Sequence, residues 1–226
     1  GAPFFQLLGR FFTFFAFGDV KMVARMVNTM SAFASGFTIL FLFWTITALT
    51  KKIVFKGKEI NTAGIITVLG TGFVGALAFT FSDSFWFSAV EGEVYATSSF
   101  FTAIVFWSIL KWEEVADEPG SYRWIILIAF LMGLSIGVHL LNLLTIPAMT
   151  LVFYFRKFKV TRWGTLLAFV ISLLILAVIQ FGIIPQLVAQ FAKTELLFVN
   201  GLGLPFNSGT VFFCLLLAFA IAFGLL

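Results

Sequence analysis

The sequence predicts an all-α protein that crosses a membrane several times. Of its 226 residues, 61% are hydrophobic and only 11% are charged, and the mean hydropathy is +1.10. Soluble domains carry about 25% charged residues, so this composition excludes an ordinary water-soluble fold. The apolar residues form long continuous runs, whereas a membrane β-barrel shows alternating segments of about 10 residues. The runs therefore predict membrane-spanning helices.

We expect the first helix, at residues 1–25, to lie in the membrane interface on the exterior side. Its phenylalanines and leucines surround a polar stripe of Gln6, Arg10 and Thr13 at helical spacing, which is typical of interfacial helices. Seven membrane segments follow, within a single transmembrane domain that covers 1–226. They are predicted at 26–50, 62–81, 94–110, 124–138, 142–155, 163–184 and 210–226. The sequence begins without methionine and ends inside an apolar run, so we expect an internal fragment of a longer protein.

The uncharged stretch 124–155 determines the predicted topology. One spanning helix needs about 20 apolar residues, so 32 are too many for one crossing and few for two. Short cytoplasmic loops are enriched in Lys and Arg. Two crossings place three basic loops, 51–61, 111–123 and 156–162, together on that side, and these loops hold 10 of the 14 basic residues. We therefore expect two short helices that meet near His139, at the floor of a cavity open to the exterior.

Glu91 and Glu93 are the strongest chemical signal on the expected exterior side. They flank Gly92, follow the aromatic stretch 85–87 and directly precede an apolar run. This context predicts a position at the membrane interface, where acids are costly and tend to be functional. Two carboxylates at this spacing can converge on a divalent cation or a cationic substrate, or one can act as a base. The alternative is an ordinary solvated acidic loop.

Three further residues are candidates for substrate binding. His139 is the only histidine, and Asn142 follows it in the expected helix break. A single histidine is often a packing residue, but within a membrane a polar side chain favours function. A neutral imidazole could donate to a phosphate or bind a metal together with the two glutamates. Arg10 could engage the phosphate of a lipid-linked substrate, or it could simply contact lipid headgroups.

Gly70, Gly72 and Gly75 match the glycine pattern of dinucleotide-binding loops. They lie inside an uncharged run, and the sequence lacks the alternation of strands and helices that such a loop requires. We interpret them instead as sites where membrane helices pack closely.

Two stretches, Phe85–Ala96 and Gly133–Pro147, resemble a Bacteroidetes-type membrane family of unknown function that is related to protein O-mannosyltransferases. The stretch Gly1–Arg10 is similar to the segment after the first exterior loop in C-type (GT-C) glycosyltransferases. The resemblance covers essentially the whole chain. It implies a GT-C-like fold and transfer of a sugar, expected to be mannose, from a polyprenyl-phosphate donor to a hydroxyl of an exported acceptor.

The same resemblance assigns roles to residues. It maps a paired-acid motif onto Glu91 and Glu93 and places the principal catalytic acid upstream of Gly1. Tyr95, which lies in the first of the two stretches, is also expected to bind substrate. It leaves open whether a divalent cation takes part. It also implies an integral protein of the bacterial inner membrane, with its active face toward the periplasm.

Two other functions fit parts of the sequence. Broken helices with glycine and a midplane polar group also occur in transporters and channels, although we find no convincing internal repeat. A membrane scaffold without chemistry would direct Glu91 and Glu93 into water or headgroups. The expected partners are a lipid-linked sugar, an exported acceptor and membrane lipids. The net charge of +4 is small and concentrated in loops, so a nucleic-acid partner is not expected.

Overall fold

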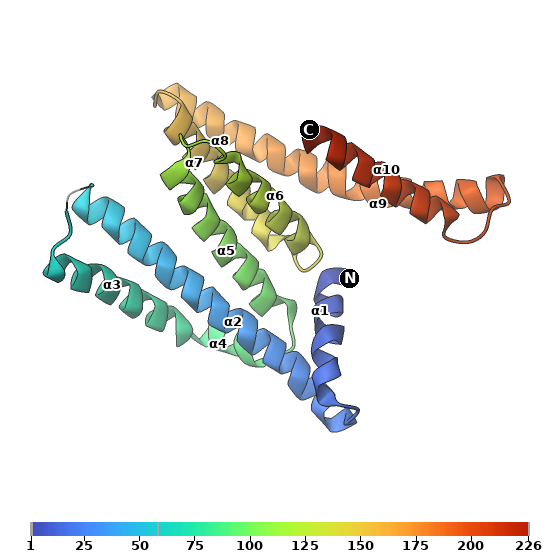
Figure 1. Ribbon diagram of the computed structural model, residues 1–226, viewed down its shortest axis with the longest axis horizontal. Helices are drawn as coiled ribbons and strands as arrows, with labels where there is room; N and C mark the ends of the chain where they lie inside the picture. Colours follow the sequence, from blue (N-terminus) through green and yellow to red (C-terminus); the bar gives the residue numbers. More distant parts are fainter. Residues whose placement is uncertain (1, 58, 226) are drawn as a thin grey trace. The chain divides into compact units, whose positions relative to one another are not determined.

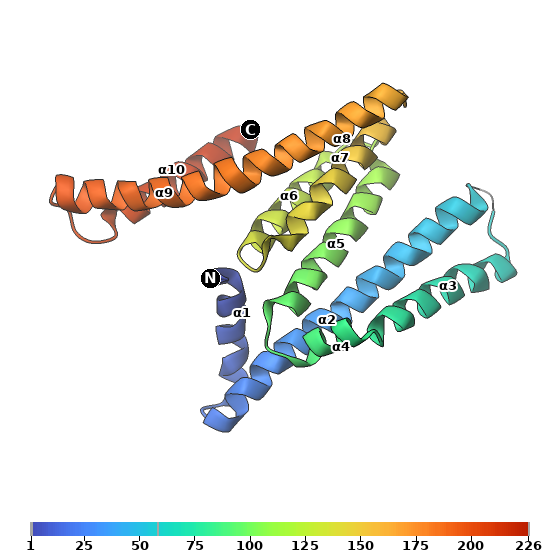
Figure 2. The ribbon, with the colours of Figure 1, turned by 180° about the vertical axis from the view of Figure 1, so that it is seen from behind.

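The computed structural model describes residues 2–57 and 59–225, and these residues confirm the all-α prediction (Figures 1 and 2). The chain forms two compact units, Gly1–Phe169 and Val170–Leu226. The first unit contains α1 (Pro3–Thr13), α2 (Val20–Thr50), α3 (Thr62–Thr80), α4 (Asp83–Val90), α5 (Val94–Val115), α6 (Tyr122–Ile136) and α7 (Thr145–Lys157). Helix α8 (Arg162–Ala177) begins in the first unit, and the second contains α9 (Ile184–Leu196) and α10 (Ser208–Leu225).

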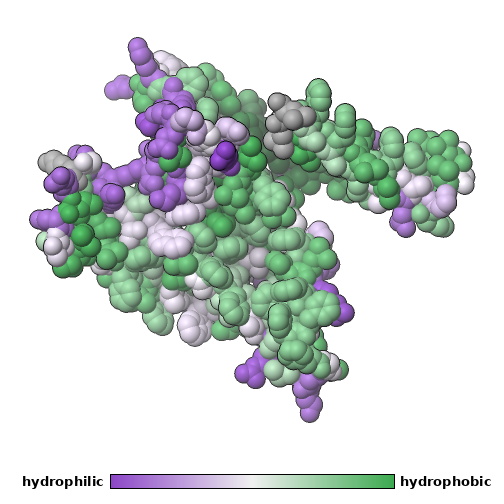
Figure 3. All heavy atoms as spheres, viewed as in Figure 1, coloured by the Kyte–Doolittle hydropathy of each residue, from purple (hydrophilic) through white to green (hydrophobic). Residues whose placement is uncertain are grey.

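Among the described residues, four helical segments are long and apolar enough to cross a membrane: Val20–Phe55, Thr62–Thr80, Val94–Val115 and Arg162–Gly201. Tyr122–Ile136 and Ser208–Gly224 are apolar but shorter. In Figure 3, apolar residues cover most of the visible helices and hydrophilic residues gather at helix ends. An integral membrane protein is thus supported, whereas seven crossings and their orientation stay a prediction.

Helix α5 is the central helix of the first unit. It packs against α2, α4, α6 and α7. Its large buried apolar side chains recur at intervals of four, four and three residues, which places them on one helical stripe. These side chains are Phe101, Val105, Ile109 and Trp112. The core of this unit therefore lies along α5.

Several helix boundaries differ from the predicted ones. Helix α2 begins at Val20 because the Asp19 side chain accepts a hydrogen bond from the Lys21 N–H at 2.9 Å, which caps the helix. The predicted interfacial segment 1–25 is therefore not one helix. Its first helix, α1, ends at Thr13, and its last residues belong to α2. The expected loop 82–93 contains α4. Helical structure also continues from α8 to Gly201, through the π-helical segment Val178–Ile183 that precedes Pro185.

Gly72 and Gly75 allow α3 to approach α2 closely. A methyl group on Gly72 would lie 2.5 Å from Cγ2 of Thr47, and one on Gly75 would lie 2.7 Å from Cδ1 of Ile46. Gly70 has no such neighbour within 4 Å. The helix-packing interpretation is therefore confirmed for two of the three glycines.

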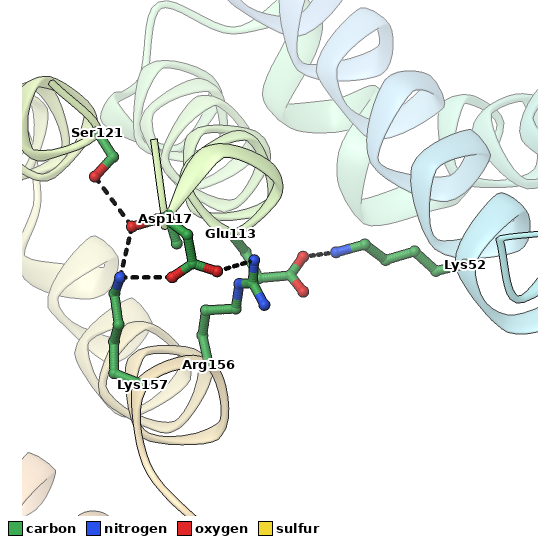
Figure 4. A network of polar contacts seen from close by, with 7 residues as sticks. Lys52, Glu113, Asp117, Ser121, Arg156 and Lys157 are labelled. Atoms are coloured by element: carbon green, nitrogen blue, oxygen red, sulfur yellow. Dashed lines mark hydrogen bonds and ion pairs between the residues drawn. The ribbon is translucent and has the colours of Figure 1, made fainter. Parts of the chain in front are cut away.

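Ion pairs join the three basic loops at one end of the first unit (Figure 4). Lys52, which follows α2, pairs with Glu113 near the end of α5. Asp117, just beyond α5, pairs with Arg156 at 2.5 Å and with Lys157 at 2.9 Å. We call this region the basic end. The three loops lie together, as the prediction of two short crossings requires.

The Asp117 ion pairs predict a specific pH dependence of stability. A hydrogen bond from Lys157, assisted by the charge of Arg156, holds the pKa of Asp117 below its ordinary value. A carboxylate with a lowered folded-state pKa stabilises the fold above its unfolded pKa, and this contribution is lost as pH falls through the folded pKa. We expect Asp117→Asn to reduce the loss of thermal stability that wild type shows between about pH 5 and pH 3.

The measurement is a set of melting curves in detergent across that pH range. Glu118→Gln is the matched control, because Glu118 is an exposed acid of the same loop with no ion pair in the described part of the chain. Identical pH profiles for wild type and Asp117→Asn would contradict the prediction.

Candidate functional site

The predicted acid pair lies at the end of the first unit opposite to the basic end. Glu91 follows α4, and Glu93 immediately precedes α5. Gly92 between them packs tightly on α2, since a methyl group there would lie 2.9 Å from Cγ1 of Val27 and 3.1 Å from Oδ1 of Asn28. This contact holds the turn between α4 and α5 against α2. Both glutamates are exposed, and among the described residues neither forms an ion pair.

His139 lies beside Tyr95, and their ring centroids are 5.6 Å apart. Tyr95 is in the first turn of α5, two residues after Glu93, whereas His139 follows α6. The ring contact therefore brings the break after α6 next to the acid turn. We call this region, defined by Glu91, Glu93, Tyr95 and His139, the acidic end.

The local hydrogen bond of His139 indicates which of its ring nitrogens can donate to a ligand. Its Nδ1 accepts a hydrogen bond from the Leu141 N–H at 3.1 Å. In a neutral imidazole with an accepting Nδ1, the proton is on Nε2. Nε2 has no protein partner within the described residues. This side chain can therefore donate one hydrogen bond to a ligand.

Asn142 lies inside the helix break rather than on its surface. Its side chain is fully buried, and Nδ2 donates to Oγ of Ser135 at 2.9 Å. Ser135 in turn donates to the Met132 carbonyl oxygen at 2.7 Å. Oδ1 of Asn142 is buried and has no hydrogen-bond partner in the described part of the protein. Asn142 therefore joins the two sides of the break.

The structure confirms the helix break predicted near 137–142. Helix α6 ends at Ile136, His139 has an extended backbone, and one short 3₁₀ segment, Leu140–Leu144, leads into α7. Pro147 lies in the first turn of α7, where it does not interrupt the helix. Helix α6 has 15 residues and a length of about 22 Å, which is less than the thickness of about 30 Å of a membrane core.

Helix α1 begins where α6 ends, as Figures 1 and 2 show. The Phe4 N–H donates to the Gly137 carbonyl oxygen at 2.8 Å. The Phe4 ring also contacts Phe101 of α5, with centroids 6.1 Å apart. Sequence reasoning missed this docking. The available signal was Pro3, which is favoured at the first position of a helix, but it did not indicate the partner.

Arg10 is not in contact with the other candidates. It is exposed on α1, its Nη1 donates to Oγ1 of Thr13 at 3.4 Å, and its guanidinium lies 4.8 Å from the ring centre of Phe14. The surrounding side chains of Phe11, Phe14 and Phe15 are exposed. This is the arrangement of a cation at an apolar surface.

A groove of about 330 Å³ lies between α2 and α5 and reaches Leu141, two residues after His139. Most of its lining is apolar, including Leu42, Phe79 and Phe106. No group of three or more His, Cys, Asp or Glu side chains suited to a metal ion occurs among the described residues. A cation bound by Glu91 and Glu93 would therefore need substrate oxygens as further ligands.

Comparison with known proteins gives one match. Residues 1–163, which lie within the first unit, match the family model described as the protein O-mannosyl-transferase TMEM260 N-terminal domain. The match leaves 164–226 outside, so it is less extensive than the resemblance inferred from the sequence. No curated protein and no solved structure matches the chain.

Proposed function

The chain belongs to the protein O-mannosyl-transferase TMEM260 N-terminal domain family, a GT-C-type membrane family, and we propose that it transfers mannose from a polyprenyl-phosphate donor to a hydroxyl of an exported acceptor. The observation that carries this proposal is the acidic end. Two exposed carboxylates, Glu91 and Glu93, lie beside the contact between Tyr95 and His139. The turn that carries the two acids thus lies next to a side chain that can donate one hydrogen bond.

Sugar transfer forms one bond, breaks another and releases one proton. The acceptor hydroxyl oxygen forms a bond to the anomeric carbon, the bond from that carbon to the phosphate oxygen breaks, and polyprenyl phosphate leaves. A base must take the hydroxyl proton. We assign Glu91 and Glu93 to the acceptor hydroxyl and the hydroxyls of the transferred sugar, with the proton passing to one of these carboxylates or to another acid of the intact protein.

The phosphate has a candidate partner in His139. Charge develops on the phosphate oxygens as the glycosidic bond breaks, and a fixed donor near them stabilises the transition state. The Nε2 proton of His139 is free to provide such a hydrogen bond, because Nδ1 is held by the Leu141 N–H. Tyr95 orients the imidazole by ring contact. Asn142 contributes by holding the break that positions His139.

The groove between α2 and α5 offers a place for the donor's hydrocarbon chain. Its apolar walls suit an isoprenoid, and Leu141 connects it to the segment that carries His139. A donor with its phosphate at His139 could thus extend its chain along the groove. Arg10, on the outer surface of α1 and beside Phe14, is better placed for headgroup phosphates.

The two ends of the first unit support one orientation in the membrane. The basic end collects the three Lys- and Arg-rich loops, which favour the cytoplasmic side. The acidic end then faces the exterior, which in a bacterial inner membrane is the periplasm. Exported acceptors would reach Glu91 and Glu93 from that side.

Reconstitution of the intact protein into liposomes tests the proposed function. Incubation with radiolabelled polyprenyl-phosphate mannose and an exported acceptor protein should yield alkali-labile label on serine or threonine hydroxyls, and heat-inactivated protein should yield none. Solute flux without sugar transfer would favour a transporter. Absence of both activities would favour a scaffold.

A further inference from the structure

A second cavity, of about 460 Å³, lies at the basic end and is separate from the acidic end. Side chains from α2, α3 and α5 form its walls. Trp44, Leu69 and Trp107 are among its apolar lining residues, and Lys51, Lys111 and Glu114 are its charged ones. The cavity therefore joins an apolar surface to a cluster of charges at the ends of two membrane helices.

We propose that this cavity binds an anionic phospholipid. Its phosphate would lie between Lys51 and Lys111, and its acyl chains would extend along Trp44, Trp107 and Leu69. The site is independent of the proposed sugar transfer, since it lies at the opposite ends of α2 and α5.

The charges of the cavity complement one phosphodiester. Two lysines and one glutamate give the lining a net charge of +1. Lys51 forms no ion pair among the described residues, and Lys111 pairs with Glu114 at 2.8 Å. Exposed pairs of this kind are weak, so Lys111 can share its ammonium group with a phosphate. Basic pockets between membrane helices on the cytoplasmic side are typical sites for anionic headgroups.

The apolar part of the cavity extends from its charged residues toward the middle of α2. Trp44 precedes Lys51 by seven residues, which corresponds to about 10 Å along a helix. Trp44 and Trp107 have ring centroids 5.6 Å apart, and Trp44 and Leu69 are 38% and 49% exposed. Tryptophan is enriched at the boundary between headgroups and hydrocarbon. A small soluble anion would leave this surface unused, whereas a phospholipid would cover it.

The arrangement of α2 and α3 explains why the cavity opens here. The two helices approach closely at Gly72 and Gly75. From there they separate toward the connection between them, as both ribbon views show (Figures 1 and 2). The lining residues Val68 and Leu69 of α3 lie on this separating part.

Native mass spectrometry and melting curves of the purified intact protein test the proposal. Wild type should retain phosphatidylglycerol through mild activation and melt at higher temperature when that lipid is added, because a ligand that binds the folded state stabilises it. The double variant Lys51→Gln/Lys111→Gln should bind phosphatidylglycerol about tenfold more weakly. Lys51→Arg/Lys111→Arg keeps both charges and should retain binding.

Matched controls separate this site from general charge attraction. Lys56→Gln/Lys159→Gln removes two exposed lysines near the same end that do not line the cavity, and it should leave binding unchanged. If Lys56→Gln/Lys159→Gln loses as much phosphatidylglycerol binding as Lys51→Gln/Lys111→Gln, the proposal is overturned. Equal stabilisation by phosphatidylcholine, or by inorganic phosphate alone, would also overturn it, because the first would exclude charge recognition and the second would exclude a lipid.

Discussion

The double variant Glu91→Gln/Glu93→Gln is expected to lower mannose transfer about 100-fold or more in the intact protein, while the melting temperature stays close to that of wild type. Proton transfer by a positioned side chain contributes about 10²–10⁴-fold to rates, and glutamine keeps the shape of glutamate without its basicity. Both side chains are exposed and no ion pair holds them among the described residues, so their loss should not weaken the fold. Initial rates with polyprenyl-phosphate mannose measure the effect.

The single variants Glu91→Gln and Glu93→Gln, together with one control, show which carboxylate takes part in transfer. Asp83→Asn replaces an exposed acid at the start of α4, eight residues before Glu91, and should retain wild-type activity. A large effect in only one of the two glutamate variants would identify the residue that takes the proton. Full activity in both single variants and in the double variant would exclude Glu91 and Glu93 from the site.

The sequence predicts the helix break well because its causes are local. Gly137 and Pro147 disfavour a continuous helix, and the stretch between 124 and 155 is too long for one crossing. The structure ends α6 at Ile136, directly before Gly137. The proximity of the three basic loops was likewise predictable, because charge asymmetry is recorded in the sequence itself.

Contacts that depend on packing could not be predicted in this way. The ring contact between Tyr95 and His139 joins residues 44 positions apart, and no periodicity in either segment specifies it. Both residues were expected to bind substrate, but their contact comes from α6 and α7 packing on α5. The local signal of Asp19 as a helix cap was present but was outweighed by the apolar pattern of 1–25.

The break and α1 are coupled through Gly137, which makes this glycine a sharp test of the fold around His139. A methyl group on Gly137 would lie 2.7 Å from Cβ of Phe4, whose N–H donates to the Gly137 carbonyl oxygen. The backbone of Gly137 is in the right-handed helical region, with φ at −72°, so alanine is tolerated there except for this clash. Helix α1 must therefore shift when Gly137 becomes alanine.

We expect Gly137→Ala to lower the free energy of unfolding by about 1–3 kcal/mol, the usual cost of overpacking, and to accelerate hydrogen exchange at the start of α1. Gly133→Ala is the matched control, because Gly133 lies four residues earlier on α6 and has no neighbour within 4 Å of an added methyl group. It should stabilise α6 slightly, since alanine has the higher helix propensity. Melting curves and amide exchange of the segment around Phe4 distinguish the two variants. Equal hydrogen exchange near Phe4 and equal melting temperatures in Gly137→Ala and Gly133→Ala would show that α1 does not dock on the break. The positioning of His139 would then need another cause.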